Sequence, residues 1–99
     1  MAIQLTKNTK QILIKGTEIE LNSVYVRIAF TCNYDATISV TFKTFLSHNS
    51  FTENNEIYTD VSNIPFEFAI LNTETQSLDV ALEYMKNKFI ELGYNATII

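Results

Sequence analysis

This chain of 99 residues has few of the residues that cross-link, bend or activate a protein. It has one cysteine, one proline, two glycines, one histidine and no tryptophan. The single Cys32 cannot form a disulfide within the chain, and its place in an alternating apolar run predicts a small buried residue without a redox role. Two widely separated glycines cannot build a glycine-rich phosphate loop, so that kind of nucleotide site is excluded.

Long apolar runs are also missing. No stretch approaches the roughly 20 apolar residues of a membrane span, and the N-terminus lacks the continuous apolar core of a signal peptide. We therefore expect no contact with a membrane. We expect a protein that is made and kept in the cytoplasm, or one that is assembled there into a larger structure.

Positive charge is in short supply as well. Seven lysines and arginines face eleven acids, which gives a net charge of -4. Nucleic-acid binding needs clustered cations, so we expect no nucleic-acid partner. The cations lie mostly in residues 1–43, whereas beyond them only Lys86 and Lys88 oppose the acids. This polarity is either ordinary solvated charge or a basis for head-to-tail assembly.

Alternating apolar and polar residues predict strands over most of the chain. Residues 11–15 and 17–21 form a predicted hairpin around Gly16. Two long strands, expected to be antiparallel neighbours, follow at 24–32 and 37–46. A further strand is predicted at 66–71, where the preceding proline allows an edge position. The predicted inward residues of the two long strands are Val24, Val26, Ile28, Phe30, Cys32, Ile38, Val40 and Phe42.

One helix is predicted, from Ser77 as N-cap to Leu92, with Gly93 as its stop. Val80 and Tyr84 lie almost opposite its apolar stripe, and Ile90 lies on a third side. Its predicted buried stripe is Leu78, Ala81, Leu82, Met85, Phe89 and Leu92.

Residues 94–99 alternate again and predict a short final strand. The fold class is therefore α+β and mostly β, with an antiparallel sheet or sandwich and one C-terminal helix packed on it. We expect a single domain over residues 1–99, because 46% hydrophobic content can fill one core and no linker or repeat interrupts the chain.

The sequence offers little chemistry. His48 is the only histidine, and the sequence shows no nucleophile and acid arranged around it. A small hydrolase centred on His48 is therefore the least favoured of the functions considered for this chain. Glu53, Glu56 and Asp60 lack the spacing and the glycine of a calcium loop. We expect no enzyme activity, no metal, no cofactor and no small-molecule substrate.

Apolar residues outside the predicted core are candidates for contact with another chain. Val80 and Tyr84 stand on the outer side of the helix, where packing against one sheet leaves them uncovered. Five further apolar residues either break the strand alternation or interrupt the polar stretch 47–63, which has no clear assignment to a helix or strand. The alternative for these residues is a loop that folds back over its own core. They are Phe45, Leu46, Phe51, Ile57 and Tyr58.

Four features follow one another along the chain: the stretch 15–28, a meander of strands, Phe66-Glu67-Phe68-Ala69, and the helical segment 81–86. In this order of segments the chain resembles small bacteriophage and prophage tail-region proteins. The resemblance implies a structural protein of the virion, in its tail, baseplate or neck. Its partners would be further copies of the chain or other virion proteins. The alternative is a small cytoplasmic binding or inhibitor module whose acidic second half meets a basic protein.

Overall fold

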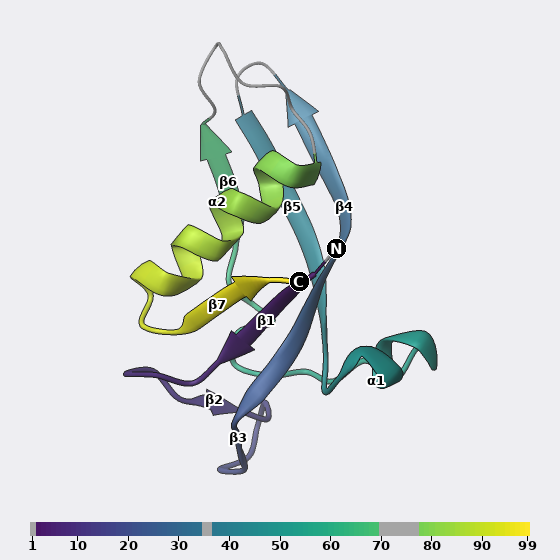
Figure 1. The fold of residues 1–99 in the computed structure, drawn as a ribbon, viewed down its shortest axis with the longest axis vertical. Coiled ribbons are helices and arrows are strands. Elements are labelled where there is room, and N and C mark those ends of the chain that lie inside the picture. Colours follow the sequence, from purple (N-terminus) through teal and green to yellow (C-terminus); the bar gives the residue numbers. More distant parts are fainter. Residues whose placement is uncertain (1, 35–36, 70–77) are drawn as a thin grey trace.

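A computed structural model of the chain describes residues 2–34, 37–69 and 78–99, except for the side chains of residues 30, 32–34 and 78. Its main element is a five-stranded antiparallel sheet with strand order β6-β5-β4-β1-β7, beside a small two-stranded sheet of β2 and β3 (Figure 1). The elements are β1 (Ile3–Thr6), β2 (Ile12–Leu13), β3 (Glu20–Leu21), β4 (Ser23–Tyr34), β5 (Thr37–Phe45), α1 (His48–Thr52), β6 (Phe66–Ala69), α2 (Leu78–Glu91) and β7 (Asn95–Ile98).

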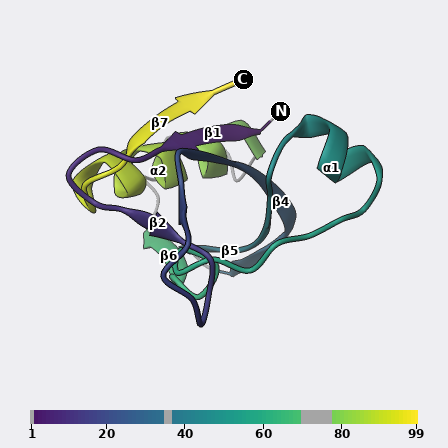
Figure 2. The same ribbon diagram turned by 90° about the horizontal axis from the view of Figure 1, so that it is seen from below.

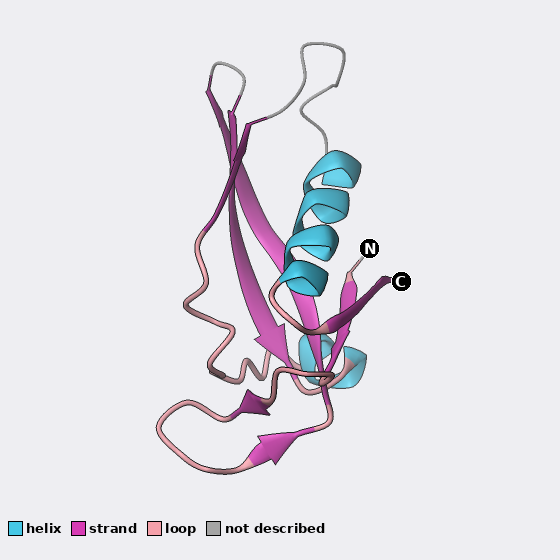
Figure 3. Ribbon diagram, turned by 90° about the vertical axis from the view of Figure 1, so that its left-hand side faces the viewer, coloured by secondary structure: helices cyan, strands magenta, loops and turns pink. Residues whose placement is uncertain are grey.

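The sheet curls around α2, which lies on its concave side, while α1 lies beyond the convex side (Figure 2). Figure 3 shows α2 running beside the long strands. The predicted fold class, α+β and mostly β with one C-terminal helix packed on an antiparallel sheet, is therefore confirmed, and the sheet is curled. The core between sheet and helix contains the predicted inward residues Val24, Val26, Ile38 and Val40. From α2 it contains Ala81, Leu82, Met85 and Phe89, and from other segments Ile3, Leu5, Ile12, Val61, Phe66 and Tyr94.

β1 is a strand that was not predicted from the alternation of apolar and polar residues. Its residues pair with β4 on one side and with β7 on the other, so that Ile3 lies between Val26 and Ile98. Two backbone hydrogen bonds join Ala2 and Ile99 beside these strands: the Ala2 N–H donates to the Ile99 carbonyl at 3.1 Å, and the Ile99 N–H donates to the Ala2 carbonyl at 2.9 Å. The final strand predicted at 94–99 is therefore present as β7, and it pairs with the first strand, β1.

The two long strands are neighbours, as predicted, but a β-bulge interrupts their register. Ile28 pairs with Phe42 and Phe30 with Thr41, so Ala29 has no partner. One extra residue shifts the period-two alternation of β4, and beyond the bulge it is Thr31 that pairs with Val40. The predicted inward placement of Phe30 and Cys32 falls outside the described side chains.

The predicted hairpin around Gly16 is confirmed. Ile12 pairs with Leu21, and the Ile14 N–H donates to the Ile19 carbonyl at 2.9 Å. Gly16 has a backbone φ of +78°, which residues with a side chain rarely adopt, so a glycine at this position makes the reversal possible.

α2 begins and ends close to its predicted limits. Gly93 has φ +106° and its N–H donates to the Ile90 carbonyl at 3.1 Å, which ends the helix as expected. The expected burial of Leu92 is wrong, because the residue follows the last helical turn and its side chain is 38% exposed. The predicted N-cap Ser77 lies outside the described residues.

The unassigned stretch 47–63 is ordered. Ser47 caps α1 by accepting the Ser50 N–H, and Val61 is fully buried in the core. Between them, the buried hydroxyl of Thr44 donates to the Ile57 carbonyl. The segment therefore belongs to the packed domain, although its polar composition gave no periodic signal.

A second, smaller apolar cluster lies on the convex face. It contains Ala2, Tyr25 and Phe45, with Phe51 of α1 packed against them. Tyr25, which is not among the predicted inward residues, is only 5% exposed, because the short α1 covers that part of the sheet. The sheet therefore has apolar packing on both of its faces.

Candidate functional site

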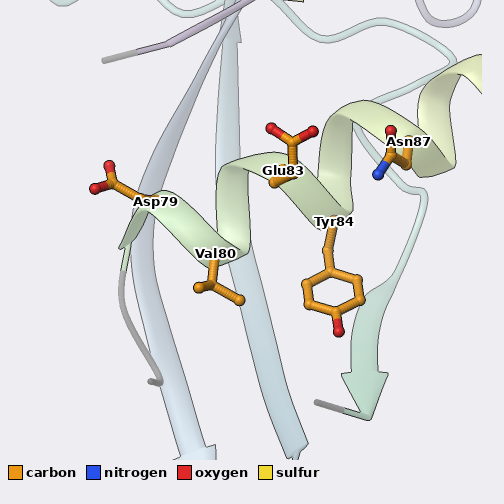
Figure 4. Close-up of a pocket in the computed structure, with 5 residues that line it drawn as sticks. All are labelled: Asp79, Val80, Glu83, Tyr84 and Asn87. Carbon is orange, nitrogen blue, oxygen red and sulfur yellow. The ribbon is translucent and has the colours of Figure 1, made fainter. Parts of the chain in front are cut away.

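A hollow of about 430 Å³ runs along the outer side of α2 (Figure 4). It is lined by Asp79, Val80, Glu83, Tyr84 and Asn87. A second hollow of about 340 Å³ shares Tyr84 and Asn87 and extends over β6. We call the two together the α2–β6 groove, whose further lining residues are Pro65, Glu67, Phe68, Lys88 and Glu91.

The two candidate residues of α2 form the apolar part of this groove. Val80 and Tyr84 point to the same side of the helix, away from the Asp79 and Glu83 carboxylates (Figure 4). The Tyr84 ring stacks on Phe68, with centroids 5.3 Å apart and planes 23° apart. Both side chains are half-buried, because the curled sheet brings β6 up beside the helix. The structure therefore covers them partly and leaves an apolar strip at the surface.

Carboxylates surround this strip. Glu67, Asp79, Glu83 and Glu91 line the groove, and Lys88 is the one cation among its lining residues. Glu83 is paired with the neighbouring Lys86 at 2.7 Å, as expected for an i,i+3 pair. Within residues 2–34, 37–69 and 78–99, no cation lies within 4.0 Å of the exposed Asp79 carboxylate.

The remaining candidate residues do not join this groove. Phe45 is 2% exposed in the convex cluster, so it packs on its own domain, which was the alternative for it. Phe51 packs on the same cluster and Ile57 is half-buried beside Thr44. Leu46 and Tyr58 stay at the surface, 49% and 60% exposed, but neither lines the α2–β6 groove.

His48 has a packing role. Its Nδ1 lies 3.2 Å from the Tyr25 hydroxyl, and the two rings meet edge to face with centroids 5.6 Å apart. These contacts fix α1 to the convex face. Among the residues that the structure describes, no group of three His, Cys, Asp or Glu side chains is placed to hold a metal ion. Nor is any helix in those segments long and apolar enough to cross a membrane.

The convex face carries a site that the sequence analysis missed. Arg27 of β4 and Lys43 of β5 are register partners on this face, beside α1. They line a hollow of about 330 Å³ with Phe51 and Asn54. Strand pairing creates this cation pair, and the two residues are 16 positions apart in the sequence, so only a correct strand register would have predicted it.

What these surfaces do is inferred from their shape, charge and apolar area. No protein-family model matches this chain, and no curated protein or solved structure matches it either.

Proposed function

We propose that this chain is a structural subunit that binds further copies of itself, and other proteins of the same assembly, through the α2–β6 groove. The observation that supports this most directly is the strip of Val80, Tyr84 and Phe68 at the surface, framed by carboxylates. An apolar centre with a charged rim is the usual anatomy of a protein interface. Aromatic side chains such as Tyr84 often supply most of the binding energy there.

The kind of assembly follows from the sequence resemblance. We propose a bacteriophage virion, with the chain in the tail, baseplate or neck, assembled in the host cytoplasm. Such a subunit works by binding its neighbours in the assembly. This fits a domain in which His48, the single histidine of the sequence, packs against Tyr25.

A second candidate is a cytoplasmic binding or inhibitor module for a basic protein. The acidic lining of the groove favours it, since Asp79 and Glu91 complement a positively charged partner. In this case the isolated chain is a monomer and forms a stoichiometric complex with one basic protein.

Sedimentation equilibrium of the full chain tests the leading proposal. We expect the wild-type protein to self-associate and Tyr84→Asp to be a monomer, because the substitution places a charge in the centre of the apolar strip. Ile90→Asp is the matched control: Ile90 is on the same helix, 50% exposed and not among the groove residues. A wild-type protein that stays monomeric at high concentration, or equal loss of association in both variants, contradicts the proposal.

A further inference from the structure

Two cations face each other on the convex surface of the sheet. Arg27 and Lys43 are direct cross-strand partners. In the described ranges of the chain, no carboxylate lies within 4.0 Å of either side chain. Like charges directly opposite each other destabilise a sheet pair. An anion bound between them would remove this repulsion.

The arginine of this pair is held in place by neutral groups. Its Nη1 donates to the Tyr25 hydroxyl at 3.1 Å, and its guanidinium carbon lies 4.3 Å from the centre of the Phe51 ring. The Tyr25 hydroxyl is itself fixed by His48 at 3.2 Å. These contacts occupy one N–H and one face of the guanidinium and leave its other donors for a ligand. Ordering of the side chain before binding reduces the entropy that binding costs.

The hollow beside the pair suits a carboxylate that arrives with apolar neighbours. Its charged lining is Arg27 and Lys43, the side-chain amide of Asn54 adds a further possible donor, and Ala29 and Phe51 supply apolar surface. Guanidinium and carboxylate groups match in plane and donor spacing, which makes arginine the preferred partner for a carboxylate.

We propose that this site binds the Asp79 carboxylate of a second copy of the chain. Asp79 is exposed and lines the same hollow as Val80 and Tyr84, so its charge complements the cations, and the apolar strip of that hollow complements the Phe51 ring. The inference rests on the proposed function and deepens it, because it names the surface of the neighbouring copy that contacts the α2–β6 groove.

The two surfaces lie on opposite sides of the sheet. Phe42 packs toward α2 on the concave side, with its ring 6.3 Å from that of Phe89, whereas Arg27 contacts α1 on the convex side (Figure 2). A contact between two different surfaces of identical chains is head-to-tail. It continues from copy to copy and closes into a ring or extends as a filament. Both outcomes suit a structural subunit present in many copies.

Charge reversal on each surface tests the contact. We expect Lys43→Glu alone and Asp79→Lys alone each to weaken self-association at least about tenfold, the effect of losing one close interfacial charge pair. Lys15→Glu is the control, since it makes the same charge change at an exposed hairpin residue. An equimolar mixture of the Lys43→Glu and Asp79→Lys proteins should associate again, because each contact then joins opposite charges. A folding defect in either variant would not be repaired by mixing.

The outcomes separate this inference from the proposed function. If Lys43→Glu associates as well as Lys15→Glu, or if the mixture stays monomeric, the Asp79 contact is wrong. In either case the groove remains the interface, provided that Tyr84→Asp is a monomer and Ile90→Asp is not. If the wild-type protein does not associate, both proposals fall. Restored association in the mixture, with loss in each variant alone, supports the head-to-tail contact.

Discussion

The two sides of α2 should respond very differently to truncation of an aromatic ring. Phe89 is fully buried, and its ring meets those of Phe66 at 5.0 Å, Tyr94 at 6.1 Å and Phe42 at 6.3 Å. Replacing a buried phenylalanine by alanine removes its transfer free energy and leaves a cavity, at a cost of about 3–5 kcal/mol. We therefore expect Phe89→Ala to lose a large part of the total stability, which is about 5–15 kcal/mol for a domain.

Tyr84→Ala should cost far less. Tyr84 is half-buried, and its ring stacks on that of Phe68. Loss of one aromatic pair and part of the buried area amounts to about 1–2 kcal/mol. The expected loss of unfolding free energy is therefore at least about 1 kcal/mol larger for Phe89→Ala than for Tyr84→Ala.

The measurement is urea unfolding followed by far-ultraviolet circular dichroism, at a protein concentration low enough to keep the chain monomeric. The slope of the free energy against urea should be equal in the three proteins, so that differences in midpoint report stability. Equal destabilisation by the two variants would refute the assignment of an inner folding side and an outer binding side to α2.

Three further outcomes follow from the fold. Gly93→Ala should cost about 2–3 kcal/mol, because an added Cβ would lie 2.7 Å from the Thr9 Oγ1 at φ +106°, whereas Gly16→Ala, with open space around it, should cost about 1 kcal/mol in the same urea assay. Burial, together with the Asp60 carboxylate, raises the pKa of Tyr94 above its usual 10.0. Its contribution to stability is therefore fully present below pH 10 and is lost as pH rises through the higher folded-state pKa, and Tyr94→Phe should remove this alkaline loss from the urea midpoint. Phe45→Ala should lower stability by about 3 kcal/mol and speed amide hydrogen exchange in α1, and unchanged exchange there would contradict the convex cluster.

Strong periodicity made much of the fold predictable. The helix, the hairpin around Gly16, the pairing of the two long strands and the edge strand at Phe66 all carry a repeat or a turn residue that sequence reasoning can use. β1 and α1 were missed. β1 is a four-residue strand outside the longer alternating runs, and α1 is a five-residue helix inside a polar stretch that has no periodic signal.

The binding surfaces were less accessible from sequence. The placement of Val80 and Tyr84 outside the main buried stripe was predictable from helical spacing, but their partial cover by Phe68 depends on how far the sheet curls. The burial of Tyr25 was not predicted, and the two alternatives for Phe45 stayed open, because α1, which covers both residues, was not predicted. The pairing of Arg27 with Lys43 requires the strand register, which composition does not supply.

Chemical-shift mapping on dilution tests the role of the α2–β6 groove most directly. In two-dimensional ¹H–¹⁵N spectra recorded from high to low protein concentration, the amides of Phe68, Val80 and Tyr84 should shift together with concentration. Amides of the hairpin around Gly16 should stay constant. Spectra that do not change with concentration, or shifts confined to the hairpin, would contradict an assembly built on this groove.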